Sequence, residues 1–391
     1  MDCDILIIGA GISGAAAAYA IGGSRRVIML EGEFQPGYHA TGRSAALYEP
    51  ALGTVTVQRF NAASGSFLRS PLLGFADRPL MTRRGGLTIA DAEGRPALDR
   101  LLKLDVPSGH AVQELTAEAA VAMVPILRRD LVHWAALEPG VMDMDVHAIH
   151  QGYLRGFASA GGKLVCDAPV KRIERRNGLW ETEAAGQSFR APIVVNAAGA
   201  WADEVARSAG LSPLGLQAKR RTVVILPAPD GLDTREWPVT TFAGEAGYLK
   251  PEAGKLLVSP GDATPVEPQD IQPEELDVAL LVDWFENKTT MSVKRVERQW
   301  AGLRTFASDD SPVLGEDPDA AGFHWLAGQG GCGIMMSESL GRSLASLLLR
   351  GELPADIRAL GVDPADISPR RLRVDNSLRI RRGATTSSPS E

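Results

Sequence analysis

The 391-residue chain has few cysteines and no long apolar run. Its three cysteines, Cys3, Cys166 and Cys332, are widely spaced and odd in number, so the sequence indicates neither a disulfide framework nor a zinc site. We therefore expect no bound metal and a reducing, cytoplasmic location. No apolar stretch reaches the roughly 18 residues that a membrane-spanning helix requires, so no membrane span is predicted.

An excess of positive charge is also missing. The formal net charge of −7 and the pI near 5.5 argue against a nucleic-acid partner. Basic residues cluster at 219–221 and 379–382, but aromatic residues are not interleaved with them, as a groove for single strands would need. The composition, 45% apolar and 23% charged, is that of an ordinary globular protein, and the length suffices for two joined domains.

The first 31 residues carry the most informative pattern. An apolar run at 5–8 enters Gly9-Ala10-Gly11-Ile12-Ser13-Gly14, an alanine-rich helix is predicted over 15–21, and a second apolar run at 27–30 ends at Glu31. A lone GxGxxG motif is a weak signal, but strand, glycines, helix, strand and terminal acid agree here. Together they predict a βαβ unit that binds a dinucleotide.

The three glycines of this motif have different predicted roles. Gly9 allows the tight turn, Gly11 lets the backbone approach a pyrophosphate, and Gly14 lets the helix pack against the strand. The N-terminus of the helix offers N–H groups to the phosphates. Glu31 lies 20 residues after Gly11, where its carboxylate can accept hydrogen bonds from both hydroxyls of an adenosine ribose.

Further elements follow along the chain. The small residues at 41–46 suit either contact with a flat ligand or a helix start capped by Thr41. Helical spacing predicts an amphipathic helix over 145–158, and the apolar run at 193–195 predicts another strand of the parallel sheet. A glycine loop at 328–333 precedes a helix predicted over 336–349. An antiparallel sheet, where we expect the substrate, is predicted from strands at 221–226, 247–250, 255–259 and 290–293.

Several longer blocks resemble the FAD-dependent amine oxidoreductases, which include D-amino-acid oxidases, glycine oxidase and sarcosine oxidase. Within that family the blocks are most similar to the D-arginine dehydrogenases, and the resemblance covers nearly the whole chain. It implies an α/β fold: a Rossmann-like FAD-binding domain joined to an antiparallel-sheet α+β substrate domain. The blocks lie at 35–39, 41–46, 150–156, 195–201, 248–251 and 300–304.

The resemblance also implies domain boundaries. The discontinuous FAD-binding domain comprises residues 1–50, 141–215 and 305–375, and the substrate-binding domain comprises residues 51–140 and 216–304. The polar residues at 376–391 are expected to form a disordered tail.

FAD is the implied cofactor, extended through the first domain. Its flavin ring would lie between residues 43–47 and the loop at 330–335, and a helix beginning near Ile334 would stabilise negative charge on the reduced ring. Cys332 would be near that ring, although buried cysteines usually act as small hydrophobes rather than forming a covalent link. The residues implied to hold FAD are Gly9, Gly11, Ile12, Ser13, Gly14, Glu31, Gly32, Ala40, Thr41, Gly42, Arg43, Ser44, Ala45, Ala46, Leu47, Val170, Gly330, Gly331, Cys332, Gly333, Ile334 and Met335.

Oxidation of an amino acid to its imine depends on orientation, because the Cα–H bond must point at flavin N5. The resemblance assigns the carboxylate anchor to Arg304, supported by Arg221 and the Tyr248 hydroxyl, since a planar guanidinium binds two oxygens at once. From the residues alone, Arg221 could equally be a solvated member of a basic triplet, and Tyr248 a half-buried strand residue. The imine would then hydrolyse to a keto acid and ammonia.

Three pocket positions depart from the D-arginine dehydrogenases. Gly86 replaces an acid that pairs with the substrate guanidinium, while Leu47 and Leu52 replace a histidine and a tyrosine. Because an unpaired buried guanidinium carries a penalty of several kcal/mol, we predict a D-amino acid with a neutral or apolar side chain. Thr241 and Gly331 are also expected to line this pocket.

Other functions remain open at this point. The same anchor serves a secondary or cyclic amino acid or a 2-hydroxy acid, and a non-catalytic flavoprotein is the alternative outside enzymes. A flavin monooxygenase is less favoured because no second nucleotide motif is present. The expected partner is a small amino-acid or amine substrate, while the electron acceptor (oxygen, quinone or a carrier protein) is left open.

Overall fold

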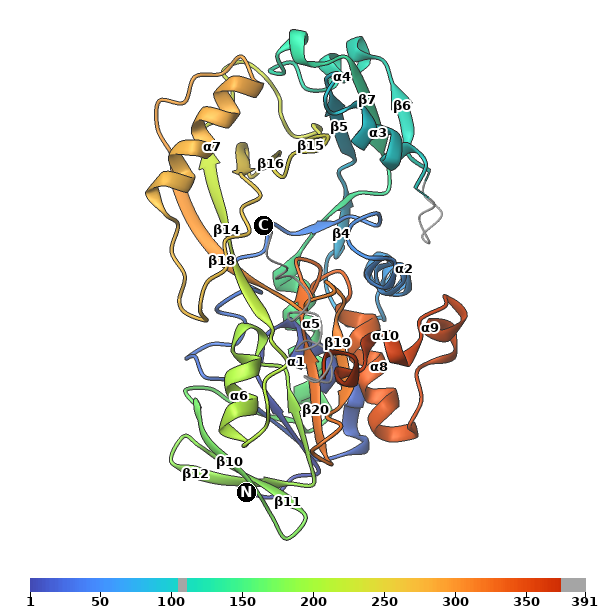
Figure 1. The fold of residues 1–391 in the computed structure, drawn as a ribbon, viewed down its shortest axis with the longest axis vertical. Helices are drawn as coiled ribbons and strands as arrows, with labels where there is room; N and C mark the ends of the chain where they lie inside the picture. The colour runs from blue at the N-terminus through green and yellow to red at the C-terminus, as the bar shows by residue number, and fades with distance from the viewer. Residues whose placement is uncertain (105–110, 374–391) are drawn as a thin grey trace, which may run out of the picture.

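Two large sheets organise the molecule (Figure 1). The computed structural model describes residues 1–104 and 111–373, so the tail predicted at 376–391 lies outside the described residues. One sheet has six strands in the order β19-β20-β13-β1-β2-β9. Their bounds are β1 Ile5–Ile8, β2 Val27–Leu30, β9 Lys163–Val165, β13 Ile193–Asn196, β19 Val313–Glu316 and β20 Phe323–Ala327.

The predicted βαβ unit is the centre of this sheet. β1 pairs in parallel with β2 on one side and with β13 on the other, and only β19 runs antiparallel to its neighbour. Because side chains alternate along a strand, Ile5 and Ile7 face one core, whereas Leu6 and Ile8 face another. Both faces are thus covered, which explains the unbroken apolar runs in the sequence.

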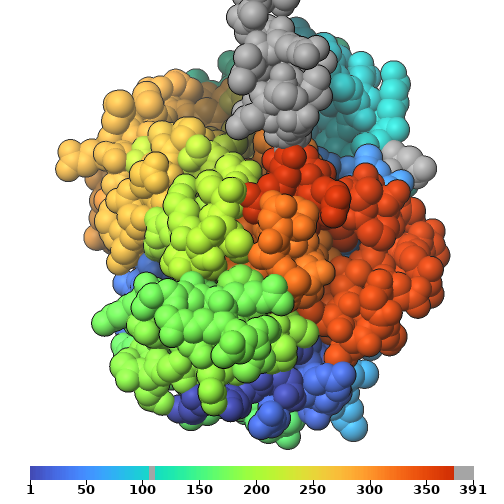
Figure 2. Space-filling view, turned by 60° about the horizontal axis from the view of Figure 1, so that its bottom comes forward, coloured from blue at the N-terminus to red at the C-terminus, as the bar shows by residue number. Residues whose placement is uncertain are grey.

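Three helices cover the first face: α1 (Ile12–Ile21), α5 (Val146–Ser159) and α8 (Ser337–Arg350). α8 approaches α1 so closely that a Cβ added at Gly341 would lie 2.7 Å from backbone atoms of Ala16. The second face is covered by α6 (Ala202–Ser208) and a small antiparallel sheet, which Figure 2 shows in green at the surface. That sheet consists of β10 (Val170–Arg176), β11 (Leu179–Ala184) and β12 (Gln187–Ala191).

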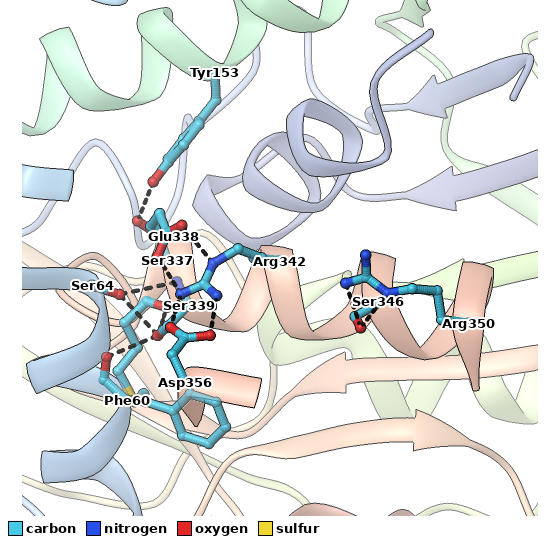
Figure 3. Close-up of polar contacts among 11 residues, drawn as sticks. Phe60, Ser64, Tyr153, Ser337, Glu338, Ser339, Arg342, Ser346, Arg350 and Asp356 are labelled. Carbon is cyan, nitrogen blue, oxygen red and sulfur yellow. Dashed lines mark hydrogen bonds and ion pairs between the residues drawn. The ribbon is translucent and has the colours of Figure 1, made fainter. Parts of the chain in front are cut away.

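Hydrogen bonds of buried hydroxyl groups hold α8 against its neighbouring helices (Figure 3). The Ser339 hydroxyl donates to the carbonyl of Phe60 and accepts from Ser64 at 2.8 Å, and both partners lie on α2 (Val55–Arg69). The Ser337 hydroxyl lies 3.0 Å from the hydroxyl of Tyr153 on α5. Since buried polar groups are costly when unpaired, these contacts fix the helix that follows the C-terminal glycine loop.

The nine-stranded sheet has the order β21-β18-β14-β17-β16-β15-β5-β7-β6. One face packs against α7 (Glu275–Lys288) and α4 (Ala117–Met123), while α3 (Arg95–Leu102) lies near β5 and β7. The strand bounds are β5 Gly86–Ala90, β6 Gln113–Leu115, β7 Trp134–Glu138, β14 Gln217–Leu226, β15 Val239–Phe242, β16 Tyr248–Glu252, β17 Lys255–Ser259, β18 Arg298–Phe306 and β21 Gln329–Gly330. The remaining elements are β3 Leu47–Tyr48, β4 Met81–Arg83, β8 Met142–Met144, α9 Ala355–Ala359 and α10 Pro364–Ile367.

Two local predictions were wrong, and one of the two alternatives for residues 41–46 is excluded. Residues 290–293 form no strand, because the N–H of Thr290 donates to the Ile126 carbonyl and that of Val293 donates to the Glu286 carboxylate. Residues 41–46 begin no helix; instead the Thr41 hydroxyl accepts from the N–H of Ile12, at the start of α1. The C-terminal helix begins at Ser337 rather than near Ile334, since residues 333–336 form turns.

Within residues 1–104 and 111–373, no helix has the length and apolar character that crossing a membrane would require.

Candidate functional site

A cavity of about 630 Å³ is lined by residues from both large sheets. It extends from the glycine motif after β1, past the loop after β2, to β14, β18 and the C-terminal glycine loop. The predicted site residues that line it are Gly9, Gly11, Ile12, Ser13, Glu31, Gly32, Ala40, Thr41, Arg43, Ser44, Ala45, Val170, Arg221, Tyr248, Arg304, Gly330, Gly331, Gly333 and Ile334.

The other predicted site residues do not line this cavity. Cys332 and Met335 lie in the core against the helices, and Leu47 is buried beside Val141 and Tyr248. Leu52 is 39% exposed at the surface. Gly14, Gly42, Ala46, Gly86 and Thr241 are also absent from the cavity wall.

The glycine motif has the geometry that its spacing predicts. Gly9 has a φ of +101°, a conformation that L side chains rarely adopt. A Cβ at Gly14 would lie 1.9 Å from the carbonyl oxygen of Gly9, so the helix can pack here only without a side chain. A Cβ at Gly11 would meet only the Thr41 hydroxyl, at 3.3 Å, and Gly11 itself lines the cavity.

The Glu31 carboxylate is held by backbone groups. It accepts hydrogen bonds from the N–H of Ala10 at 2.8 Å and of Glu33 at 3.1 Å. These contacts fix its position at the end of β2 and on the cavity wall. Since each carboxylate oxygen has two lone pairs, the predicted contacts with ribose hydroxyls remain compatible with this arrangement.

Sequence reasoning missed an aromatic cluster on the same wall. His39 Nε2 lies 2.8 Å from a carboxylate oxygen of Glu33, and its ring centroid lies 4.5 Å from that of Trp201. All three residues line the cavity. No local pattern reveals this grouping, because Trp201 comes from the segment after β13 and joins the others only in the fold.

The two predicted anchor arginines share one face of the nine-stranded sheet. Arg221 on β14 pairs with Gly302 on β18, and Arg304 lies two residues farther along β18. The alternation of side chains therefore puts both guanidinium groups on the same side. Burial, followed by the charge of Arg304, lowers the pKa of Arg221 to about 10, which leaves it cationic at neutral pH.

Several buried polar atoms on the cavity wall have no hydrogen-bond partner among the described residues. They are Arg221 Nε, the Tyr248 hydroxyl and Gln329 Nε2. The side-chain oxygen of Gln329 accepts from the Ser13 hydroxyl at 2.5 Å and so joins the two glycine loops. Because buried polar groups are normally satisfied, these three donors indicate a polar ligand, and the cavity suits an extended dinucleotide together with a small substrate.

Gly331 supports Arg304 directly. A Cβ at this position would lie 2.8 Å from Nη1 of the Arg304 guanidinium. We predict that Gly331→Ala lowers substrate turnover about tenfold, because the added methyl group would displace the Arg304 guanidinium. Thermal stability should change little, because a flexible side chain moves at lower cost than backbone. Steady-state kinetics and a melting curve test this prediction. In the control Gly322→Ala, the added Cβ would instead meet the Pro192 carbonyl. A loss of turnover in this control equal to that in Gly331→Ala would contradict the prediction.

Cys332 is poorly suited to form a covalent bond. Burial raises the pKa of its thiol to about 12, so the nucleophilic thiolate is scarce at neutral pH. We predict that acid precipitation releases all the flavin into solution and that a Cys332→Ser variant retains the same flavin content. Yellow colour that remains with the precipitated protein would contradict this.

Within residues 1–104 and 111–373, no group of three or more His, Cys, Asp or Glu side chains is placed to hold a metal ion.

The family described as FAD dependent oxidoreductase (DAO) matches residues 4–347. The chain belongs to this family. Glycine oxidase of Geobacillus kaustophilus is 26% identical over 90% of this chain and 95% of its own length. Mouse mitochondrial dimethylglycine dehydrogenase is 25% identical over 92% of this chain, which spans 44% of that longer protein.

Solved structures agree with this family. The crystal structure of the Geobacillus glycine oxidase has a TM-score of 0.80 at 23% identity and covers 94% of this oxidoreductase and 98% of its own chain. That of iminodiacetate oxidase from Chelativorans sp. BNC1 has a TM-score of 0.75 at 25% identity and covers 93% and 98%. This oxidoreductase is thus an FAD-dependent enzyme with the predicted α/β fold, a Rossmann-like part joined to a second sheet.

Proposed function

We propose that this oxidoreductase oxidises the Cα–N bond of an amino acid to the imine, which water hydrolyses to a keto acid and ammonia. The supporting observation is the pair Arg221 and Arg304, which share one sheet face and the wall of the cavity. Two guanidinium groups beside an unpartnered tyrosine hydroxyl suit a carboxylate. Relatives named for glycine, dimethylglycine and iminodiacetate all take a substrate in which a carboxylate stands beside an amine.

The chain's own residues would mainly orient the substrate. The two arginines bind the carboxylate oxygens, and the Tyr248 hydroxyl donates a third hydrogen bond, which together fix the direction of the Cα–H bond. FAD, when bound, supplies the acceptor for a hydride equivalent. The amine must be deprotonated beforehand, and no side chain is assigned as its base.

The finer substrate prediction, an amino acid with a neutral or apolar side chain, rests on the absence of an acid at Gly86 and stays a prediction. The D configuration, the cytoplasmic location and the electron acceptor stay predictions. We also propose that the predicted FAD-binding segments form the part around the six-stranded sheet, and the predicted substrate-binding segments the part around the nine-stranded sheet.

Anaerobic mixing of the yellow protein with D- and L-amino acids, N-methyl amino acids and 2-hydroxy acids tests this proposal through loss of flavin absorbance. We expect bleaching by primary amino acids. Bleaching by 2-hydroxy acids alone would contradict the proposed substrate class, and bleaching by N-methyl amino acids alone would contradict ammonia as the product. An unchanged spectrum with every compound would indicate a flavoprotein without this turnover.

A further inference from the structure

Gln329 carries a buried hydrogen-bond donor that the proposed function does not use. It lines the cavity, and its Nε2 has no hydrogen-bond partner among the residues that the structure describes. The other two unpaired donors on this wall, on Arg221 and Tyr248, are assigned to the substrate carboxylate. Because a buried donor without a partner is costly, Gln329 requires an acceptor from a bound molecule.

The oxygen of the same amide fixes where this donor lies. It accepts from the Ser13 hydroxyl at 2.5 Å, and a Cβ built on Gly333 would lie 3.2 Å from it. Both neighbours also line the cavity. Since Oε1 and Nε2 belong to one planar amide, Nε2 lies close to the first turn of α1, which contains Ser13.

The N-terminus of α1 has fewer free backbone donors than its glycine motif suggests. The N–H of Ile12 donates to the Thr41 hydroxyl at 2.9 Å, and that of Ala10 donates to the Glu31 carboxylate at 2.8 Å. A helix N-terminus binds phosphate through such N–H groups. A diphosphate placed here would therefore need donors from another part of the chain.

Positively charged side chains do not fill this need. Among the described residues, the lysine and arginine side chains that line the cavity are Arg43, Arg221 and Arg304. Arg43 pairs with Asp270 and donates to two backbone carbonyls, and the other two are assigned to the substrate. An uncharged donor beside the first turn of α1 is thus suited to a phosphate oxygen.

We propose that Gln329 binds the diphosphate of FAD, with Nε2 donating to a phosphate oxygen while Ser13 holds the other end of the amide. A hydrogen bond to a charged oxygen is stronger than one to a neutral hydroxyl, which favours the diphosphate over the ribityl chain as the acceptor. This inference concerns the cofactor and holds whichever amino acid is the substrate.

Titration of the apoprotein with FAD and with ADP tests this inference. ADP carries the diphosphate of FAD but neither the ribityl chain nor the flavin ring. Gln329→Met keeps the length of the side chain and removes its hydrogen bonds, so we expect it to weaken the binding of both ligands about tenfold. Isothermal titration calorimetry measures the two dissociation constants without enzyme turnover.

Gln329→Glu tests whether the side chain acts as a donor. A carboxylate of nearly the same shape cannot donate and would repel a phosphate, so we expect FAD and ADP to bind about a hundredfold more weakly. Gln299→Glu is the matched control for the added charge, because Gln299 is exposed on β18 and does not line the cavity. This control should bind both ligands as the wild type does.

Other outcomes would overturn the inference. Weaker binding of FAD with unchanged binding of ADP in Gln329→Met would move the contact to the ribityl chain or the flavin ring. Unchanged binding of both ligands would exclude a role of Gln329 in holding the cofactor, as would FAD binding by Gln329→Glu equal to that of the control. Circular dichroism of the apoprotein verifies folding, and if one Gln329 variant does not fold, the other decides.

A double-mutant cycle tests the supporting role of Ser13. If Ser13 acts through Gln329, Ser13→Ala should weaken FAD binding in the wild type but have little further effect in Gln329→Met. An equal loss of affinity in both backgrounds would show that Ser13 contributes independently of Gln329.

Discussion

Replacing Arg304 with methionine is expected to lower kcat/KM for amino-acid oxidation about a thousandfold. Losing one partner of a buried, charge-assisted contact costs about 2–5 kcal/mol, and about 4 kcal/mol corresponds to three orders of magnitude in rate. We expect a larger loss of kcat/KM at Arg304 than at Arg221, because the Arg304 guanidinium lies against Gly331 at the cavity wall. Arg221 instead has a carboxylate of its own nearby, with Asp262 3.9 Å away.

Stopped-flow bleaching and steady-state kinetics measure this loss, and the flavin spectrum verifies that the cofactor remains bound. Arg298→Met is the matched control, since Arg298 lies on the same strand but is exposed and packs over Trp300. Arg304→Lys should recover only part of the activity, because an ammonium cannot bind two oxygens in a fixed plane. An Arg304→Met variant within tenfold of the wild type would remove Arg304 from the anchor.

The local patterns of the sequence were sufficient for the centre of the six-stranded sheet. Continuous apolar runs predicted β1, β2 and β13, and the glycine motif predicted the turn into α1, because these features depend on neighbours in the chain. The same reasoning failed at residues 290–293. There the alternating pattern suggested a strand, but the Ile126 carbonyl accepts from the N–H of Thr290 and the Glu286 carboxylate accepts from that of Val293.

The grouping of side chains on the cavity wall could not be derived from the sequence. Glu33, His39 and Trp201 share this wall, yet Trp201 follows β13 and meets His39 only in the fold, where their ring centroids lie 4.5 Å apart. Gly86 and Thr241, which were expected to line the pocket, do not line the cavity. Strand register and loop placement depend on the whole fold, so these groups become visible only in three dimensions.

Two alanine substitutions in the glycine motif are expected to separate cofactor binding from folding. In Gly14→Ala the new methyl group would lie 1.9 Å from the Gly9 carbonyl oxygen and 3.3 Å from the Ile7 side chain. Overpacking typically costs about 1–3 kcal/mol, and the rigid backbone of Gly9 puts this site at the upper end. We expect Gly14→Ala to lose both thermal stability and FAD.

Gly11→Ala should lose FAD alone. Its methyl group meets only the Thr41 hydroxyl, at 3.3 Å, and Gly11 has an ordinary φ of −69°, so the protein without cofactor can keep its stability. Gly11 nevertheless lines the cavity, and the sequence predicts that a pyrophosphate approaches its backbone closely, where an added methyl group would interfere. We expect FAD affinity to fall at least a hundredfold in a titration of the apoprotein, while the apoprotein melts within about 2 °C of the wild-type apoprotein. Tight FAD binding by Gly11→Ala would show that the phosphates lie elsewhere in the cavity, and equal melting temperatures for the two variants would contradict the distinct packing role of Gly14.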